Sequence, residues 1–435
     1  MKFSVNRVYD IKNLFIELKQ DQNVVILIGP NGSGKTTLLK MFDYVLNLKH
    51  FLLFDFEFDI IDIEIGKNKI KICKDVDVDT GDFLKYYLND IPIGDFKKNG
   101  NRDFLNAIRR YSSNRLIQVN DEQFLDARTN KEISIEEVLA SLPEHIKAKI
   151  ISNSSFIPEK VKTIFSVFNV HFVTSDRLEI KVESNTETYY RDSDRQSVKT
   201  IEHFSNDLKL KITGILSNYA DNSRKIDKDF PQNIIRKISS KQNISKPKLN
   251  QIIDEMESIS KLIYSSGLLM DDDSSLSKIK LISDDDVTNI VINQYMEDSI
   301  NKLSSLRRFA EKMNLFKELI NSKLRRKKVL INKHDGFYVV NDSSTIVDLK
   351  NLSSGEQQQI ILFYDLLFQS KENQIYLIDE PEISLHVEWQ RSFLSDITKI
   401  VGFNKIQVIL ATHSPQIIGD NWDIAIDFGE SNVTS

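Results

Sequence analysis

Glycine and cysteine are both scarce in this chain. Only 14 of its 435 residues are glycine, about 3% where about 7% is usual in proteins. Between residues 101 and 335 glycine occurs only at Gly214 and Gly267, and a stretch so poor in glycine favours helices. The single cysteine, Cys73, excludes an intrachain disulfide framework and a zinc site of the CxxC kind.

The chain also lacks an excess of either charge and any long apolar run. It carries 58 basic and 63 acidic residues, a net charge of −5, so its bulk charge does not indicate nucleic acid or membrane binding. The apolar run Val24–Ile28 is far too short to span a bilayer, and the first residues lack the apolar core of a signal peptide. With 40% apolar residues, the composition predicts a globular, cytoplasmic protein of two or three domains with no membrane partner.

Both ends of the chain show the pattern of a parallel α/β sheet, in which apolar strands alternate with helices. The expected strands lie within 1–28, 171–180, 374–378 and 405–411, and the expected helices at 36–48 and 387–401. Alternating apolar and polar residues predict antiparallel hairpins in 53–73 and 328–341. Residues 81–165 are expected to be mixed and mostly helical.

The middle of the chain, residues 198–322, has the helix period. Apolar side chains recur every three or four positions from Leu249 to Ile263 and from Ile292 to Ile320, which predicts long amphipathic helices packed on one another. The acidic runs Asp271–Asp273 and Asp284–Asp286 are expected to be solvated loops and helix N-terminal charges.

A phosphate-binding pattern, GxxxxGK[ST], is matched at every fixed position between an apolar strand and a helix. Glycines let backbone N–H groups approach phosphate oxygens, and a helix N-terminus adds partial positive charge. Lys35 is expected to reach the β- and γ-phosphates of ATP, and the Thr36 hydroxyl to ligate Mg²⁺. The nucleotide-binding residues expected here are Gly29, Pro30, Asn31, Gly32, Ser33, Gly34, Lys35, Thr36 and Thr37.

Two acids end the apolar strand at residues 375–378. Asp379 is expected to hold the Mg²⁺ that bridges the phosphates, and Glu380 to polarise the attacking water as the catalytic base. Without the phosphate loop, two acids after a strand are more often an ordinary polar loop.

Two further motifs complete an ordered set. The run Leu352-Ser353-Ser354-Gly355-Glu356-Gln357 opens a helix and resembles the signature of ABC-type ATPases, and Ala411-Thr412-His413-Ser414-Pro415 resembles the segment that carries their switch histidine. All four motifs occur in the order of that family. The chain therefore resembles an ABC-type ATPase.

The resemblance implies a P-loop ATPase head of α/β class, a mixed sheet core with an antiparallel β subdomain, interrupted by a helical insertion. It implies an N-terminal half of the head at 1–190, a helical arm at 198–322 and a C-terminal half at 323–435. In this family two heads sandwich two ATP molecules, each held by the phosphate loop of one head and the signature of the other. A homodimer or a higher homo-oligomer is therefore expected.

The same resemblance assigns roles to the signature and the histidine. His413 is expected at the γ-phosphate, as a catalytic residue beside Glu380 and Lys35, although a lone histidine is more often structural. The residues expected on the partner's nucleotide are Ser353, Ser354, Gly355 and Glu356.

The branch of the family follows from spacing and from one further run. Lys35 and Ser353 lie 318 positions apart, more than in transporter ATPases, as in the SMC, RecF and OLD-like branch. The run from Asp379 to Gln390 resembles the DEPExxLHPxWQ run of OLD-like ATPases, with Val387 where proline is usual. Its His386 either lies at the dimer interface or caps and packs its own helix.

Two further features stay open. Arg177, in a segment that resembles an element of bacterial defence ATPases, either approaches phosphate or forms a structural ion pair. Five basic residues in six positions fit contact with DNA phosphates, and equally fit the cations that complement a helix C-terminus. These five are Lys323, Arg325, Arg326, Lys327 and Lys328.

OLD-family nucleases carry a C-terminal TOPRIM domain, for which the 22 residues after His413 leave no room, so this chain is not expected to cut nucleic acid by itself. It resembles stand-alone antiphage defence ATPases, of the PtuA type in Septu systems and the AriA type in PARIS systems. That resemblance implies a slow, regulatory ATPase whose dimeric heads act as sensor and scaffold for a separately encoded nuclease or toxin. The alternatives are a repair ATPase of the SMC/RecF kind that clamps duplex DNA, and an ATP-dependent scaffold that scarcely hydrolyses.

Overall fold

The computed structural model divides the chain into two compact units. The first comprises Met1–Ser197 and Ser370–Ser435, and the second Val198–Gln369. None of the helices in the described part of the chain is long and apolar enough to cross a membrane. The described residues are 1–9, 12–19, 22–77, 81–97, 116–118, 123–126, 131–134, 157–173, 179–180, 198–240, 245–269, 285–383 and 385–428.

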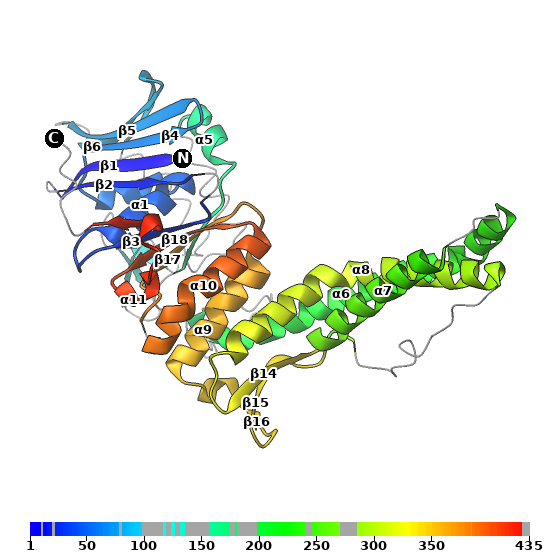
Figure 1. The fold of residues 1–435 in the computed structure, drawn as a ribbon. Coiled ribbons are helices and arrows are strands. Elements are labelled where there is room, and N and C mark those ends of the chain that lie inside the picture. Colours follow the sequence, from blue (N-terminus) through cyan, green and yellow to red (C-terminus); the bar gives the residue numbers. More distant parts are fainter. Residues whose placement is uncertain are drawn as a thin grey trace. The chain divides into compact units, whose positions relative to one another are not determined.

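A parallel sheet in the first unit joins the two ends of the chain (Figure 1). In it Ile28 lies opposite Thr412, and Asp379 lies opposite Ala411. The carboxyl ends of three strands therefore meet at one edge, where parallel sheets place their ligands. In sheet order the strands are β11 (Val170–Val173), β17 (Ile375–Asp379), β18 (Gln407–Thr412), β3 (Val24–Ile28) and β19 (Ala425–Asp427).

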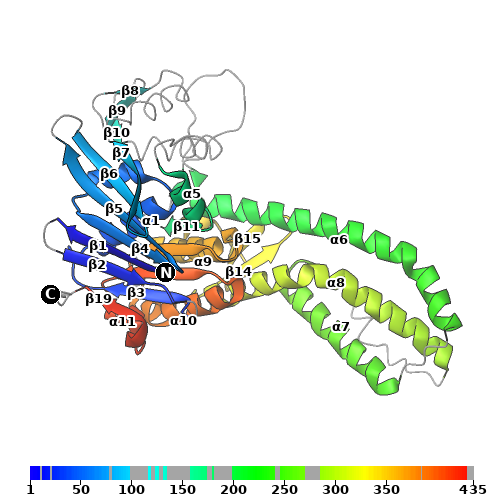
Figure 2. The ribbon, with the colours of Figure 1, turned by 90° about the horizontal axis from the view of Figure 1, so that it is seen from above.

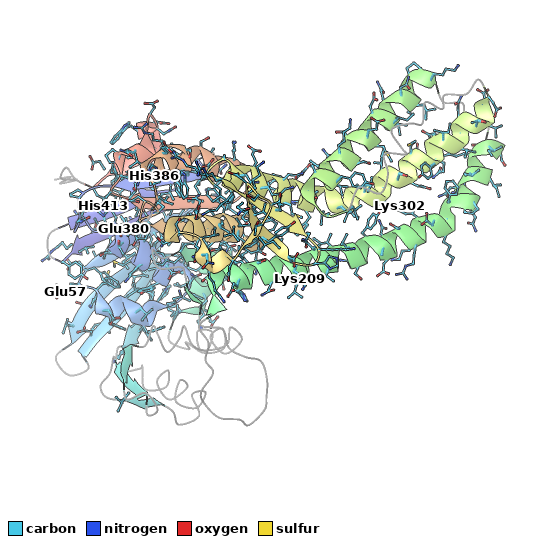
Figure 3. The ribbon with its side chains drawn as sticks, turned by 90° about the horizontal axis from the view of Figure 1, so that it is seen from below. Glu57, Lys209, Lys302, Glu380, His386 and His413 are labelled. Atoms are coloured by element: carbon cyan, nitrogen blue, oxygen red, sulfur yellow. The ribbon has the colours of Figure 1, made fainter. Side chains whose placement is uncertain are left out.

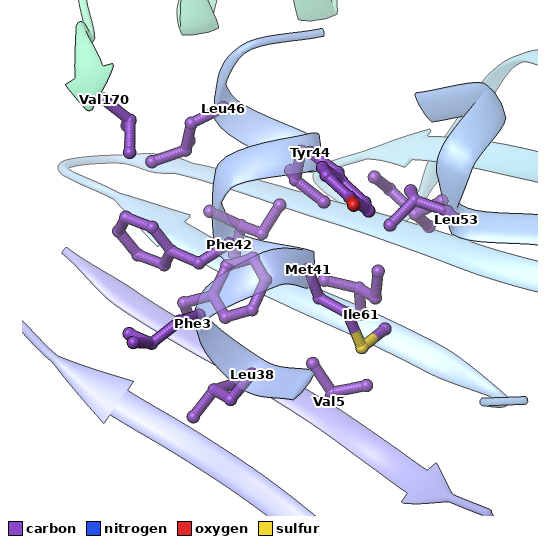
Figure 4. Packing of buried hydrophobic residues seen from close by; sticks show 14 of the residues in the cluster. Phe3, Val5, Leu38, Met41, Phe42, Tyr44, Leu46, Leu53, Ile61 and Val170 are labelled. Carbon is purple, nitrogen blue, oxygen red and sulfur yellow. The ribbon is translucent and has the colours of Figure 1, made fainter. Parts of the chain in front are cut away.

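Helix α1 (Lys35–Leu46) packs between this sheet and an antiparallel one. Its Phe42 meets Phe3 edge to face, with ring centroids 5.1 Å apart (Figure 4). Leu27 and Leu377 of the parallel sheet belong to the same buried cluster. The antiparallel strands, in sheet order, are β2 (Lys12–Glu17), β1 (Lys2–Val8), β4 (Ile60–Ile65), β5 (Asn68–Asp77), β6 (Gly81–Leu88) and β7 (Ile91–Lys97).

Several shorter elements complete the described part of the first unit. They are η1 (His50–Asp55), β8 (Leu116–Gln118), β9 (Gln123–Asp126), β10 (Lys131–Ser134), α5 (Glu159–Phe165), β12 (Glu179–Ile180), α10 (Val387–Asn404), α11 (Pro415–Ile418) and η6 (Trp422–Ile424). The α/β fold class is confirmed, with a five-stranded parallel sheet, antiparallel sheets of six and three strands, and a helical segment in the middle of the chain.

The prediction that residues 81–165 are mostly helical is wrong for the described part of that range. Residues 81–97 form the hairpin β6–β7, turned by Asn89 and Asp90, both with positive φ. Side chains at Leu84 and Tyr86 are buried while Lys85 between them is more exposed, which is strand alternation. Two consecutive residues that tolerate positive φ are the signal of a two-residue hairpin turn, and this signal was missed.

The first hairpin is shorter than predicted. Strands β4 and β5 pair across Gly66 as expected, but residues 53–55, the start of the predicted alternation, belong to the 3-10 helix η1 (His50–Asp55). Here Phe54 is buried and its ring lies 5.6 Å from that of Phe96. Tertiary packing of several aromatic rings in one place overrides the local alternation.

Acidification is expected to destabilise the first unit through His50. This side chain is fully buried, with Nδ1 2.8 Å from the Tyr86 hydroxyl and Nε2 2.9 Å from the Val45 carbonyl oxygen. Burial lowers the pKa of His50 from 6.5 to about 4, an effect that the hydrogen bond to Val45 only partly offsets. Between pH 6.5 and about pH 4, His50 is therefore protonated in the unfolded chain and neutral in the folded protein. The free energy of unfolding is expected to fall by about 3 kcal/mol as the pH drops through this window.

Urea unfolding at a series of pH values measures this loss. In His50→Gln the dependence of stability on pH is expected to be shallower than in the wild type. His386→Gln, at an exposed histidine, is the matched control and keeps the wild-type dependence. The same pH dependence in all three proteins would contradict the assignment to His50.

The second unit contains the long helices predicted for the middle of the chain. Helix α8 packs along α7 and α6, and Figure 2 shows the three side by side. The predicted stripe is confirmed in the second half of α8, where Leu306, Met313 and Phe316 are fully buried. The unit's elements are β13 (Val198–Lys199), α6 (Thr200–Ser239), α7 (Lys246–Ser266), α8 (Asp286–Asn321), β14 (Lys327–Asn332), β15 (Gly336–Asn341), β16 (Ile346–Val347), η4 (Leu349–Asn351), α9 (Ser354–Tyr364) and the π-helix η5 (Asp365–Gln369).

The acidic runs behave as predicted where they are described. The side chain of Asp285 caps α8 by accepting from the backbone N–H groups of Val287 and Thr288. Residues 271–273 and 284 lie outside the described residues. The predicted hairpin at 328–341 is confirmed by the pairing of β14 with β15.

Candidate functional site

The phosphate-loop residues connect β3 to α1, as the sequence pattern predicts. Gly32 and Gly34 have φ values of +74° and +97°, which side chains disfavour, and Gly34 is the N-cap of α1. At Gly29 a Cβ atom would lie 2.9 Å from Phe428. The glycines therefore serve the loop's own geometry, and they leave its backbone bare at the N-terminus of a helix.

The Lys35 ammonium is buried inside this loop. It donates to the carbonyl oxygens of Gly29 and Pro30, at 2.8 and 3.1 Å, and to the Ser33 hydroxyl at 3.2 Å. It also lies 3.2 Å from Nδ1 of His413. The loop thus folds around the cation that is expected to meet the phosphates.

Thr36 and Asp379, the two expected Mg²⁺ ligands, touch one another. The Thr36 hydroxyl lies 3.1 and 2.9 Å from the two carboxylate oxygens of Asp379. Burial raises the pKa of the Asp379 carboxyl, the hydrogen bond from Thr36 opposes this, and the negative charge of Glu380 adds to the rise. The site therefore concentrates negative charge next to a hydroxyl, which suits a hard divalent cation.

Glu380 and His413 lie close to one another (Figure 3). Oε1 of Glu380 lies 3.2 Å from Nε2 of His413. Because an ammonium only donates, Nδ1 of His413 accepts from Lys35 and the neutral ring carries its proton on Nε2, toward Glu380. Glu380 has a φ of +46°, unusual for a residue with a side chain, and its N–H donates to the Ala411 carbonyl at 2.9 Å.

The signature residues lie in the second unit, at the start of α9. Ser353 is the N-cap, and its hydroxyl accepts from the Glu356 N–H at 3.3 Å while the Glu356 carboxylate accepts from the Ser353 N–H at 2.9 Å. Ser354 and Gly355 form the first turn of the helix. The predicted turn before a helix is therefore a capping box.

Glu356 has a second partner that sequence reasoning missed. Its carboxylate oxygens lie 2.9 and 2.8 Å from the ammonium of Lys327 at the start of β14. Burial alone would raise the pKa of Glu356, but the hydrogen bonds from Lys327 and from the Ser353 N–H outweigh it and the net shift is downward. Glu356 is thus engaged inside the unit, where it holds the signature turn.

The far end of α9 is also tied to the long helices. The Tyr364 hydroxyl donates to Asp207 of α6 at 2.5 Å, and the Lys312 ammonium of α8 donates to the Leu367 carbonyl in η5 at 2.7 Å. Leu367 lies in the last turn of this helical segment, where carbonyl groups have no partner within the helix, and Lys312 supplies one. Both ends of α9 are therefore anchored to elements adjoining or forming the predicted arm.

The remaining sequence candidates have varied placements. His386 is the N-cap of α10, and its Nδ1 accepts from the Glu388 N–H at 3.4 Å, as in the alternative in which His386 caps its own helix. Val387 occupies the first position of that helix, where proline is common but not required. Arg177 lies outside the described residues. In the basic patch, Lys323 is buried, and Lys327 is half-buried and paired with Glu356.

Two further side chains at the site went unpredicted. The Glu382 carboxylate accepts from the His413 N–H at 2.6 Å, and Gln390 accepts from the Ser414 hydroxyl at 2.7 Å. Glu382 and Gln390 both lie in the run from Asp379 to Gln390 that resembles OLD-like ATPases. Their presence in that run was the sequence signal that could have identified them as site residues.

The fold and the site define a P-loop nucleotide-binding head with a helical insertion. The AAA ATPase domain family matches residues 10–418, and the chain belongs to that family. It is an ATPase of the P-loop type. No curated protein matches the chain.

Three solved structures are similar to the chain at low identity. The Smc head domain of Pyrococcus furiosus, with an extended coiled coil and the C-terminal domain of ScpA bound, is 13% identical, with 96% of this chain and 90% of that chain covered and a TM-score of 0.36. The SMC head domain from Thermotoga maritima is 12% identical, with 98% and 91% covered and a TM-score of 0.33. An SmcHead bound to the C-winged helix domain of ScpA is 11% identical, with 96% and 91% covered and a TM-score of 0.36.

Proposed function

We propose that this protein is an ABC-type ATPase whose heads close on ATP as a homodimer and reopen after hydrolysis. The observation that carries the proposal is the direct contact among the candidate groups, with Lys35 and Glu380 on either side of one histidine ring, His413. Lys35 and His413 are 378 positions apart in the sequence and yet lie in contact. Such contact is expected of residues that form one site, and it is not expected of chance matches to separate motifs.

Mg²⁺ fits the residues present. The charges of Glu380, Glu382 and Lys35 all act on the Asp379 carboxyl, and Thr36 offers a hydroxyl at Asp379. Thr36 and Asp379 would hold the ion. When bound, it would neutralise charge on the phosphates.

The chain's own residues divide the work of hydrolysis. Lys35 exchanges the loop carbonyls for phosphate oxygens, and the loop's backbone N–H groups hold the remaining oxygens. Glu380 accepts the proton of the attacking water, whose oxygen bonds to the γ-phosphorus as the bond to the bridging oxygen breaks. His413 presents Nε2–H beside Glu380 and keeps that carboxylate aimed at the γ-phosphate.

The second unit supplies the other half of the composite site in this proposal. Ser353 and the first N–H groups of α9 form a helix N-terminus that suits the γ-phosphate of the partner subunit's ATP. Loss of that phosphate would release the heads, a ligand-driven switch. The anchoring of α9 by Lys327, Asp207 and Lys312 would connect this switch to the long helices.

In the cell we propose a regulatory role in bacterial antiphage defence, in which the closed dimer holds or releases a separately encoded nuclease or toxin. The resemblance of the run from Asp379 to Gln390 to OLD-like ATPases supports this role. The long helices offer a docking surface.

Mixing two inactive variants tests the composite site. Lys35→Ala removes the phosphate-loop cation and Ser353→Arg blocks the signature, so each homodimer is expected to be inactive. A heterodimer of the two retains one intact site made from opposite subunits. An equimolar mixture is therefore expected to regain about a quarter of the wild-type ATPase rate, since about half of the dimers are mixed and each has one of two sites.

Ser343→Arg, at an exposed serine of the second unit, is the matched control and should leave the rate unchanged. No recovery on mixing, with both variants folded, would argue against a site shared between two subunits. Full activity of Ser353→Arg alone would remove the signature from the mechanism.

A further inference from the structure

The segment that carries His413 is held by a carboxylate that was not among the expected site residues. Oε1 of Glu382 lies 2.6 Å from the backbone nitrogen of His413, the first residue after β18. Its Oε2 is buried with no hydrogen-bond partner among the described residues. A short hydrogen bond to a carboxylate is among the stronger ones in proteins.

A second link fixes the next residue of the same segment. The Ser414 hydroxyl donates to Oε1 of Gln390 at 2.7 Å, and Nε2 of Gln390 donates to the Leu385 carbonyl at 3.1 Å. The Ser414 N–H donates to the Thr412 hydroxyl at 3.0 Å. Residues 412–414 are therefore bound to the 382–390 segment at two successive positions.

These hydrogen bonds matter because both ring nitrogens of His413 lie close to charged side chains. Its Nδ1 and Nε2 each lie 3.2 Å from a charged group, Lys35 on one side and Glu380 on the other. A ring held at both nitrogens tolerates little displacement of its backbone, since hydrogen bonds weaken steeply with distance and angle.

We propose that Glu382 is a positioning residue for ATP hydrolysis, which acts by holding the His413 backbone so that its ring aligns with Lys35 and Glu380. This inference rests on the proposed function of the site. The alternative is that Glu382 acts through its charge, since it is one of the groups that raise the pKa of Asp379. Substitutions of Glu382 can distinguish its role as a hydrogen-bond acceptor from the effect of its negative charge.

Two substitutions at Glu382 distinguish these roles. Glu382→Gln keeps a side-chain oxygen that can accept from His413 but removes the charge, so kcat is expected to stay within about threefold of the wild type. Glu382→Ala removes the acceptor and is expected to lower kcat by about tenfold to a hundredfold, the effect of one hydrogen bond to a charged group. The Kd for ATP is expected to change by less than about threefold in both, because Lys35 and the loop remain. A glutamine variant as impaired as the alanine variant, with its amide intact, would overturn the proposal.

A double-mutant cycle tests whether Glu382 acts through His413. In a His413→Ala background the ring is gone, so adding Glu382→Ala is expected to lower kcat by no more than about twofold further. Glu57→Ala, at an exposed glutamate of the same unit, is the matched control and should change no measured rate. The same tenfold or larger loss in both backgrounds would show that Glu382 acts independently of the histidine.

Hydrogen exchange at the His413 amide gives a readout that does not depend on hydrolysis. The exchange rate is expected to rise at least tenfold in Glu382→Ala and to stay near the wild-type rate in Glu382→Gln and Glu57→Ala. If exchange responds as expected while His413→Ala hydrolyses ATP normally, the backbone hold stands and the proposed catalytic role of His413 fails. Unchanged exchange in Glu382→Ala overturns the inference itself.

Discussion

Glu380→Gln is expected to lower kcat for ATP hydrolysis by about a hundredfold to ten-thousandfold, the contribution of a general base. Glutamine keeps the shape of the side chain and an oxygen within reach of Nε2 of His413, but it has no charge with which to take a proton from water. ATP binding needs Lys35 and the loop, which the substitution leaves intact. The variant is therefore expected to bind ATP and to stay in the closed dimer.

Two measurements check this prediction. Phosphate release in single turnovers reports the chemical step, and sedimentation in the presence of ATP and Mg²⁺ reports the dimer. We expect the variant to be dimeric in ATP and monomeric without nucleotide, while the wild type returns to monomer as ATP is consumed. Glu57→Gln, at an exposed position of the same unit, is the control and should behave like the wild type. Normal turnover by Glu380→Gln would show that another group takes the proton.

Lys35→Ala is expected to weaken ATP binding by at least about a hundredfold, since two or more charge-assisted hydrogen bonds to phosphate are lost. The substitution also leaves the carbonyls of Gly29 and Pro30 and the Nδ1 atom of His413 without their shared donor. The effect on ATP therefore combines a lost contact with a loosened loop. Both act in the same direction.

Equilibrium binding of a fluorescent ATP analogue measures this loss directly. Lys40→Ala, at a half-buried lysine on the same helix, is the matched control and should retain wild-type affinity. Circular dichroism establishes that both variants are folded. Binding of ATP by Lys35→Ala at the wild-type Kd would contradict the assignment of this loop to the phosphates.

Local patterns were enough to predict many elements. The five consecutive buried residues of β3 and the glycines at 32 and 34 place a strand, a tight loop and a helix in order, because backbone conformation there depends on neighbours in sequence. The same holds for the second half of α8, where buried side chains recur every three or four positions from Leu306 to Ile320.

Predictions failed where distant residues decide the outcome. Residues 81–97 form a hairpin because β6 finds a partner in β5, with Ile72 opposite Tyr86. Residues 50–55 form a 3-10 helix in a cluster of aromatic rings that includes Phe96 and Tyr86, supplied by strands more than thirty positions away. Short apolar segments have weak intrinsic preferences, so pairing and packing choose among them.

The sequence by itself determined the ATPase class, and it predicted most of the candidate site residues, since phosphate loops and strand-end acids are local arrangements with few acceptable residue types. Only the tertiary structure determined which of these side chains contact one another. It placed His413 between Lys35 and Glu380, Glu382 on the His413 backbone and Lys327 on Glu356. These pairs are joined through the register of a parallel sheet or through packing at the base of long helices. Neither the sheet register nor this packing can be predicted from the spacing of residues along the chain.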